Sequence, residues 1–325
     1  MNPGGNLISK NTVRGGTSLV AIAINSPDKV AVNLDSRIST QIRGSLPLSI
    51  DIWDVVARTV EKVEKKVSLP FHLHHDKKFY ALDPILVGAA FGFDASEIKP
   101  ILALFTLYYL EVHLIDDLIE DQGKFYSKFK NGDCNTDGSF KAASSLFTLV
   151  FNLASTELIR AMEIDGAAAA EMLTLLNRSL LSQIRHFVVE KDTLNTEQVL
   201  EAKMHKVAGP ATAMLADMLN TKYRFDRERF RHLKESLFYL GSLTQFTDDI
   251  RDRGKDAKTG NANLLLSLER DFSAGVADEF ETLYKRDEEL MLECAAKTGL
   301  QPDCDLLRAI PWHPFVVKPL IRELL

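Results

Sequence analysis

The chain has 325 residues, a formal net charge of −6, 46% hydrophobic residues and 26% charged residues. These values are typical of a globular protein with a sizeable core. The acidic balance argues against a general nucleic-acid or anionic-membrane binder, so an anionic substrate needs a local basic cluster or a bound metal. Three scattered cysteines without metal-ligand spacing predict reduced thiols, and we expect a cytoplasmic protein.

Residues 1–45 differ from the rest of the chain. Two β-rich runs, 18–24 and 29–33, flank a turn at 25–28 and predict a small N-terminal β-hairpin or a disordered arm. From residue 46 to 325 apolar residues recur at helical spacing, as in Ile50, Trp53, Val56 and Val60. Strands do not alternate with helices in this pattern, so we predict an all-α fold with one large helical domain over 46–325.

The most apolar stretch, 101–115, contains Glu111 and His113. It is shorter than the roughly 20 apolar residues that a membrane-spanning helix needs, which predicts a buried core helix and no membrane anchor. Later helices are expected near 139–163, 166–190, 196–220, 227–256, 275–298 and 303–324.

A first acidic cluster, formed by Asp116, Asp117, Glu120 and Asp121, ends that apolar helix. Carboxylates four residues apart share one helix face and repel one another unless a cation compensates them. Phe105 and Tyr109 precede Asp116 by eleven and seven residues, on nearly the same face. Acid at the rim of an aromatic wall favours a metal site, and a solvated helix end is the alternative.

A second cluster places Asp248, Asp252 and Asp256 at steps of four residues, a single carboxylate stripe. A surface helix held by ion pairs of about 0.2–0.5 kcal/mol each is the alternative. Two carboxylate helices together favour Mg²⁺, which binds through a few carboxylates plus substrate phosphates and stabilises a departing diphosphate. Arg251 and Lys255 are placed to donate hydrogen bonds to that diphosphate.

Residues 245–260 (QFTDDIRDRGKDAKTG) resemble the second aspartate motif of squalene and phytoene synthases, and Val207-Ala208-Gly209 resembles the Val-Ala-Gly signature of the same family. Asp116-Asp117-Leu118-Ile119-Glu120 is similar to the DDxxD/E motif of class I terpene cyclases. The chain therefore resembles the class I isoprenoid synthases over residues 105–260.

Departures from the squalene and phytoene synthase pattern favour the cyclase branch. His113 stands where that family has Arg, and residues 261–265 (NANLL) replace its Arg-x-Tyr-Leu-Pro segment. The missing basic positions imply a site for one diphosphate. The resemblance then implies cyclisation of farnesyl diphosphate to a sesquiterpene hydrocarbon, with a general similarity to fungal humulene-forming cyclases.

The resemblance and the residue pattern together define the expected site. The catalytic residues are Asp116, Asp117 and Arg251. The ligands of three Mg²⁺ ions are Asp116, Asp117, Glu120, Asp121, Asp248, Asp252 and Asp256. The substrate contacts are Arg251, Lys255, Lys203, Lys206, Phe105, Tyr109, Phe187, Phe246 and Gly209, where aromatic faces stabilise carbocations and ordinary core packing is the alternative. We expect a prenyl diphosphate as partner, allow for a homodimer, and expect no nucleic acid.

Two other functions stay open. Prenyl transfer, either head-to-head or onto an aromatic acceptor, uses the same motifs, and a non-catalytic helical interaction protein would carry the acidic clusters as solvated surface. A zinc enzyme is disfavoured because His72, His74 and His75 are not completed by a recognisable zinc motif.

Pro210 lies inside a helical pattern, lacks an N–H, and its ring clashes with the carbonyl of Lys206. The helix is therefore predicted to break here. Free carbonyls near residues 206–208 would then face the carbocation, and a kink that serves packing alone is the alternative.

Overall fold

The computed structural model describes residues 18–26, 30, 36–67, 72–73, 81–120, 129–130, 137–187, 194–272, 274–315 and 317. Over these residues the fold is helical apart from one pair of two-residue strands, which confirms the predicted all-α class. The helices before residue 165 are α1 (Leu19–Asn25), α2 (Ser36–Lys66), α3 (Leu82–Ala90), α4 (Lys99–Glu120) and α6 (Asp137–Arg160). The later ones are α7 (Gly166–Phe187), α8 (Thr196–Val199), η2 (Leu200–Ala208), α9 (Gly209–Tyr223), α10 (Arg227–Thr259), α11 (Leu264–Asp271), α12 (Val276–Lys297), α13 (Cys304–Ala309) and η3 (Ile310–Trp312).

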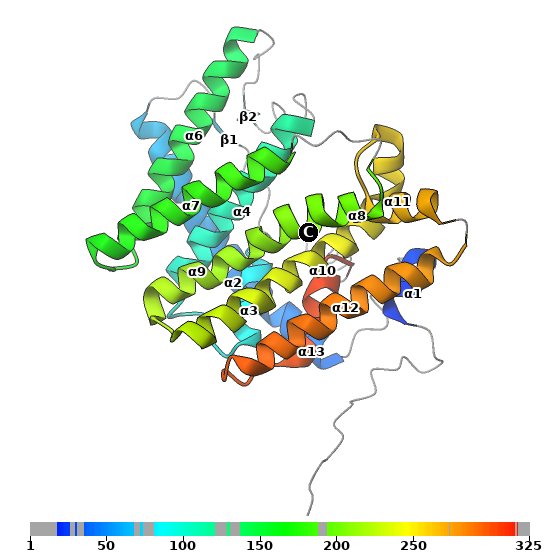
Figure 1. Cartoon of the computed structure of the whole chain (residues 1–325). Coiled ribbons are helices and arrows are strands. Elements are labelled where there is room, and N and C mark those ends of the chain that lie inside the picture. The colour runs from blue at the N-terminus through cyan, green and yellow to red at the C-terminus, as the bar shows by residue number, and fades with distance from the viewer. Residues whose placement is uncertain are drawn as a thin grey trace, which may run out of the picture.

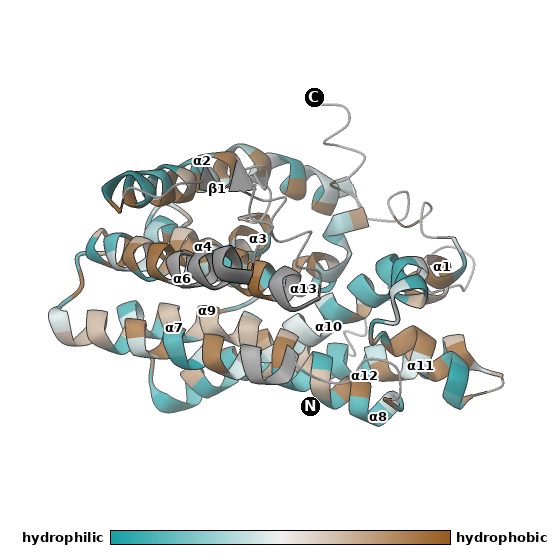
Figure 2. Ribbon diagram, turned by 90° about the horizontal axis from the view of Figure 1, so that it is seen from above, coloured by the Kyte–Doolittle hydropathy of each residue, from teal (hydrophilic) through white to brown (hydrophobic). Residues whose placement is uncertain are grey.

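The helices form three layers. Figures 1 and 2 show α7, α9, α10 and α12 in front, α3, α4 and α6 in the middle, and α2 behind them. The 33-residue α10 packs most extensively on its two neighbours α9 and α12. The second aspartate cluster therefore lies on the helix that is central to the front layer.

The middle-layer helix α4 is buried on nearly every side. Leu102, Leu104 and Leu107 have no exposed surface, as expected for a helix that is hydrophobic all round. This confirms that residues 101–115 form a core helix. None of the described helices combines the length and the apolar character that crossing a membrane requires.

Side chains cap the N-termini of α8 and α10. The Asn195 side chain accepts a hydrogen bond from the Gln198 N–H at 2.9 Å, and the Gln198 side chain accepts from the Asn195 N–H at 3.0 Å. This capping box starts α8 where the sequence predicts it. Asp226 similarly caps α10 by accepting from the Arg229 N–H at 2.9 Å.

The predicted N-terminal hairpin is wrong. Residues 19–25 form α1. The Ala21 N–H in its first turn donates a hydrogen bond to the Ser18 hydroxyl oxygen at 3.1 Å. Val20 and Ala23 are buried and α1 packs on α12, so a tertiary contact overrides the β-propensity of the run. The predicted domain boundary near residue 45 falls inside α2.

The described strands β1 (His72–Leu73) and β2 (Phe129–Lys130) come from distant segments. They pair antiparallel, with His72 opposite Lys130 and Leu73 opposite Phe129. Of the three histidines considered for zinc, the structure describes only the backbone of His72; His74 and His75 lie outside the described residues.

The predicted helix break at Pro210 is wrong, because the helix continues and changes from a π-helix to an α-helix. Residues 200–208 form η2, which ends where the Gly209 N–H donates to the Met204 carbonyl five residues back. Pro210 then occupies the first turn of α9, where its missing N–H costs nothing. Whether carbonyls near residue 206 serve a cation stays a prediction.

Glycines let η2, α9 and α10 approach closely. A Cβ on Gly241 of α10 would lie 2.3 Å from the Ala208 carbonyl oxygen and 2.5 Å from the Thr212 hydroxyl. A Cβ on Gly209 would lie 2.7 Å from the Phe238 ring. Both positions therefore require glycine for packing.

Gly241→Ala should lower the free energy of unfolding by about 1–3 kcal/mol, because the new methyl group meets backbone that cannot move aside. Gly44→Ala in α2 is the matched control, since its Cβ meets nothing within 4 Å. The control should gain about 0.5–1 kcal/mol from reduced chain entropy. Urea unfolding measures both, and equal stability of the two variants would contradict the close approach.

Glu111 is a carboxyl group buried in α4, with 5% of its surface exposed. Burial raises the pKa of the Glu111 carboxyl to about 8. Between roughly pH 4.5 and 8 the folded chain therefore keeps a proton that the unfolded chain has lost. Stability falls as the pH rises through this window, by up to about 1.4 kcal/mol per pH unit.

Glu111→Gln removes this titration, so the variant should gain stability relative to the wild type as the pH rises from 5 to 8. Urea unfolding at several pH values measures the difference. If the free energies of unfolding of the variant and the wild type differ by the same amount at every pH between 5 and 8, Glu111 is already ionised in the folded chain.

Candidate functional site

Arg251 joins two carboxylates of the second cluster on α10. Its Nη2 lies 2.7 Å from Asp248 Oδ1, and its Nε lies 3.1 Å from Asp252 Oδ1. The Asp248 side chain is 27% exposed and that of Asp252 is 38% exposed, so solvent and ions reach both. The four-residue spacing thus brings these two aspartates together, as predicted.

The electrostatics of this group match its geometry. Burial raises the pKa of the Asp248 carboxyl to about 6, Arg251 opposes that shift, and Asp252 adds to it. Burial alone would lower the pKa of Arg251, but Asp248 and Asp252 hold it above its usual value. One guanidinium therefore compensates two carboxylates, which leaves room for a further positive charge.

Asp249, the neighbour of Asp248, has a different role. Its side chain is only 1% exposed and accepts hydrogen bonds from Lys203 Nζ at 2.8 Å, Gln245 Nε2 at 2.8 Å and the Leu264 N–H at 2.6 Å. A buried carboxylate with three donors, one of them cationic, is satisfied by the protein. We therefore read Asp249 as the anchor of the segment that follows α10.

Asp256 belongs to the same buried network. Its Oδ2 accepts from Asn263 Nδ2 at 2.8 Å, and Asn263 also donates to the Asp249 carbonyl. Burial raises the pKa of the Asp256 carboxyl, while Asn263 and Lys203 oppose that shift. Asp256 is thus hydrogen-bonded to Asn263, whereas Asp248 and Asp252 share Arg251, and the role of Asp256 as a metal ligand stays a prediction.

Asp256 also lines a cavity of about 150 Å³, together with Asn261, Arg270 and mostly apolar neighbours. Ligand pockets usually measure about 300–1,000 Å³. This cavity is too small for a prenyl chain, so it is not the substrate chamber.

The aromatic side chains of α4 contact one another, and one of them acts electrostatically on the second cluster. The rings of Phe105 and Tyr109 stack with centroids 6.0 Å apart, and the Tyr109 ring meets His113 edge-on at 4.7 Å. Tyr109 also contributes to the raised pKa of Arg251, which places α4 within electrostatic range of the α10 carboxylates. Of the aromatic residues that precede the first cluster, Tyr109 therefore lies within electrostatic range of Arg251 in the second.

Parts of the predicted site lie outside the described side chains. The backbone of residues 116–120 forms the last turn and a half of α4, but the side chains of Asp116, Asp117 and Glu120 are not described. Asp121 lies outside the described residues, as does the side chain of Phe187 at the end of α7.

The remaining predicted contacts have other partners. Lys203 donates to the Ala262 carbonyl at 2.7 Å as well as to Asp249, and Lys206 pairs with Glu201 at 2.9 Å. Lys255 is exposed on α10. Phe246 is fully buried against Phe280 and Tyr284 of α12, and Gly209 packs against Phe238, so core packing accounts for both positions.

Sequence reasoning missed Asp83 and His313, which lie near Asp248. His313 Nδ1 is 3.0 Å from Asp83 Oδ1. Burial lowers the pKa of His313, but Asp83 and Asp248 raise it above its usual value. The Thr247 hydroxyl donates to the Pro311 carbonyl at 2.7 Å and holds this segment against α10. These residues are more than 60 positions apart, so no local spacing signals their proximity.

Comparisons with known proteins establish the fold. No protein-family model matches the chain, and no curated protein sequence matches it significantly. A solved geranylgeranyl pyrophosphate synthetase from the archaeon Geoglobus acetivorans is similar, with a TM-score of 0.55 and 16% sequence identity. The alignment covers 92% of this chain and 99% of that chain. The chain thus has an all-helical fold of the isoprenoid synthase type.

Asp248→Asn and Asp249→Asn should differ although they are adjacent. Asp249→Asn breaks a buried ion pair and should cost about 3 kcal/mol of unfolding free energy. Asp248→Asn disturbs a partly exposed pair and should stay within about 1 kcal/mol. It should instead abolish the thermal stabilisation by Mg²⁺ with inorganic diphosphate. Similar losses of stability in both variants would contradict this division of roles.

Proposed function

We propose that the chain is a Mg²⁺-dependent terpene synthase that ionises one prenyl diphosphate, farnesyl diphosphate above all, and cyclises it to a sesquiterpene hydrocarbon. The observation that carries the proposal is the position of Arg251. It bridges Asp248 and Asp252 on α10 and lies within electrostatic range of Tyr109 on α4. Carboxylates, a guanidinium and aromatic rings are the groups that diphosphate ionisation requires.

The donor set fits Mg²⁺. This ion prefers carboxylate oxygens and substrate phosphates to nitrogen or sulfur ligands, and Asp248 and Asp252 both reach solvent. Bound Mg²⁺ would neutralise the diphosphate and stabilise the charge that develops as the C–O bond breaks. Asp116, Asp117, Glu120 and Asp121 are the ligands that we propose on the α4 side, with three ions in total.

Arg251 has two roles in this proposal. Without a metal it neutralises Asp248 and Asp252. When cations take over that function, its N–H groups become available to donate to the leaving diphosphate, and such charge-assisted bonds are about twice as strong as neutral ones. Lys255, exposed on the next turn of α10, is the second proposed donor.

The hydrocarbon needs an apolar chamber that stabilises cations without capturing them. Tyr109, half-buried beside Phe105 and within electrostatic range of Arg251, is the π-face that we propose for this chamber. We leave Phe246 out of this wall because it packs between α10 and α12. A humulene-type skeleton is the product class that the sequence resemblance favours; a homodimer and a cytoplasmic location stay predictions.

Prenyl chain elongation is the second candidate. The fold is similar to that of a geranylgeranyl pyrophosphate synthetase. In addition, Asp248-Asp249-Ile250-Arg251-Asp252 repeats the spacing of Asp116-Asp117-Leu118-Ile119-Glu120, so the two clusters are alike. However, Asp249 is buried in a network with Lys203, which leaves two carboxylates of the second cluster near solvent.

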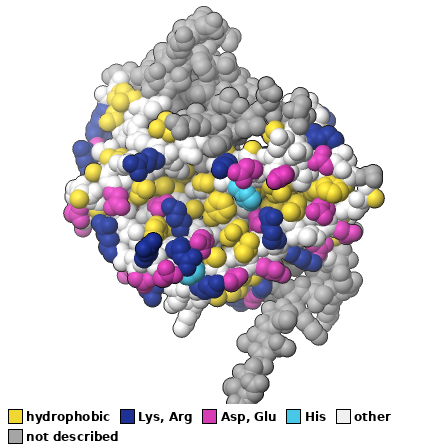
Figure 3. All heavy atoms as spheres, viewed as in Figure 1, with side chains coloured by type: hydrophobic (Ala, Val, Ile, Leu, Met, Phe, Trp, Pro, Cys, Tyr) yellow, Lys and Arg dark blue, Asp and Glu magenta, His cyan; other side chains and the backbone are white. Residues whose placement is uncertain are grey.

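The mixed positive and negative side chains on the front face in Figure 3 are unlike a continuous basic nucleic-acid surface.

Incubation of the purified chain with Mg²⁺ and C10, C15 or C20 prenyl diphosphates, each alone, tests the proposal. A cyclase should release diphosphate and a volatile C15 hydrocarbon from the C15 substrate without a co-substrate. Parallel reactions contain a five-carbon prenyl diphosphate as acceptor. A longer product that retains its diphosphate would establish elongation, and a C30 hydrocarbon would establish head-to-head coupling; either result would overturn the cyclase proposal.

A further inference from the structure

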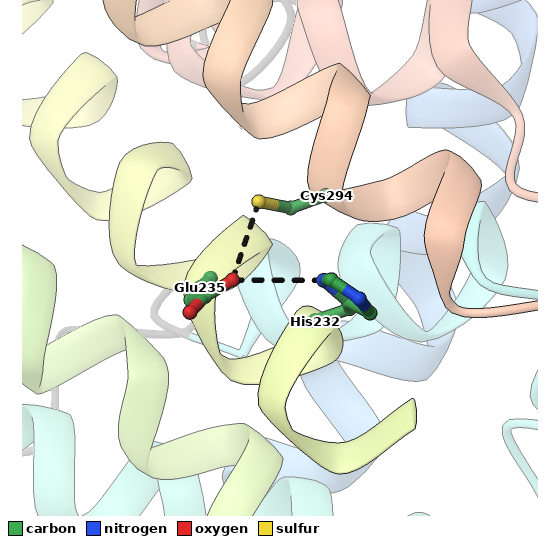
Figure 4. Close-up of side chains that lie close together, drawn as sticks. All are labelled: His232, Glu235 and Cys294. Atoms are coloured by element: carbon green, nitrogen blue, oxygen red, sulfur yellow. Dashed lines mark hydrogen bonds and ion pairs between the residues drawn. The ribbon is translucent and has the colours of Figure 1, made fainter. Parts of the chain in front are cut away.

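A second group of potential metal ligands lies between α10 and α12. It consists of His232 and Glu235 on the first half of α10 and Cys294 on α12 (Figure 4). One ligand atom from each residue lies within 4.8 Å of the other two. Residues three positions apart share a helix face, so the sequence presents His232 and Glu235 together and the helix packing adds Cys294.

The spacing of the three donors suits a small cation. Glu235 Oε2 lies 3.6 Å from His232 Nδ1 and 3.6 Å from Cys294 Sγ. Ligands about 2.0–2.3 Å from a tetrahedral zinc ion are separated from one another by about 3.3–3.5 Å. The two donors next to Glu235 are therefore near the separation that one shared ion imposes, and the third pair, His232 and Cys294, lies within 4.8 Å.

The imidazole has an unmet bonding requirement. The His232 ring is 12% exposed, and its Nδ1 is buried without a hydrogen-bond partner. A buried polar atom without a partner costs free energy unless something binds it. On the other side of the ring, Nε2 lies 3.8 Å from Glu228. A carboxylate on the far nitrogen is the usual support for a metal-bound histidine. In the metal-free chain Arg231 lies nearer to Nε2, at 3.1 Å, so a metal on Nδ1 requires Arg231 to give up this position to Glu228.

Ion pairing alone is the competing account of this group. Arg231 pairs with Glu228 at 2.8 Å and with Glu235 Oε1 at 3.3 Å, and its Nη2 also lies 3.1 Å from His232 Nε2. Arg231 also donates to Glu235 Oε2 at 3.5 Å, the oxygen that lies beside His232 and Cys294. This pairing network accounts for the carboxylates and for the thiol, which donates to Glu235 Oε2 at 3.6 Å, but it leaves His232 Nδ1 without a hydrogen bond.

We infer that His232, Glu235 and Cys294 form a Zn²⁺-class metal site that links α10 to α12, with solvent as the fourth ligand. Imidazole and thiolate ligands select such borderline cations over Mg²⁺. His232 precedes Asp248 by 16 residues, which at 1.5 Å per residue is about 24 Å along α10. The site is therefore separate from the proposed diphosphate chemistry and stabilises the fold.

Metal binding at this site should release a proton. Burial, together with Glu235, raises the pKa of the Cys294 thiol to about 11, so the thiol is protonated in the metal-free chain. A cation that binds the thiolate must displace that proton, and its affinity should increase with pH.

Titration of the metal-free, full-length chain with Co²⁺ in excess Mg²⁺ tests the inference. The Mg²⁺ occupies hard carboxylate sites, and a thiolate-to-cobalt charge-transfer band reports sulfur ligation. Wild type should show a saturable band at one equivalent that Zn²⁺ removes. Cys304→Ser is the matched control, since Cys304 is the other described free thiol, and it should behave as wild type.

Cys294→Ser should abolish the band, and His232→Ala should weaken Co²⁺ binding at least tenfold. Zn²⁺ should raise the melting temperature of wild type and Cys304→Ser but not of Cys294→Ser. A band that persists in Cys294→Ser, or no saturable band in wild type, would overturn the inference. Glu235→Gln provides an independent variant if either substitution impairs folding, and undiminished affinity there would also count against the site.

Discussion

Charge compensation along α10 is the constraint on which the centre of this structure depends. Four aspartates lie within nine residues of one helix, and they are held by three different partners, Lys203, Arg251 and Asn263. Lys203 of η2 holds Asp249 in the interior, and Arg251 spans Asp248 and Asp252 near solvent. The buried pair fixes the helix and the segment after it, whereas the exposed group retains unbalanced negative charge. Asp249 thus stabilises the fold, and its neighbour Asp248 is the carboxylate that we propose for the chemistry.

The neighbouring π-helix η2 carries Lys203, the cationic partner of Asp249. Pro210 removes one N–H, and η2 absorbs the change by bonding Gly209 to Met204 rather than by leaving the helix open. Gly241 then admits the Ala208 carbonyl against α10, so η2 lies close enough for Lys203 to reach Asp249. A π-segment inside a long helix is frequently found at functional sites, which agrees with its place beside the carboxylate helix.

The spacing of residues along the sequence predicted those features that form between residues three or four positions apart. The core helix α4, the capping box at Asn195 and the meeting of Asp248 with Asp252 all follow from three- and four-residue spacing. Tertiary contacts decide the rest. Asp256 turns toward Asn263 of the following loop, and His313 reaches Asp83 across the fold. Residues 19–25 form a helix because a serine cap and α12 outweigh their β-propensity.

In the proposed function, Asp248 and Asp252 lose their ion pairs with Arg251 and coordinate a metal ion when substrate binds. A crystal structure with Mg²⁺ and a prenyl diphosphate analogue that does not ionise tests this exchange most directly. The account predicts a cation coordinated by Asp248 and Asp252 at about 2.0–2.1 Å, with Arg251 bonded to the diphosphate. A bound diphosphate with no metal within coordination range of these carboxylates, and with Arg251 still between them, would contradict it.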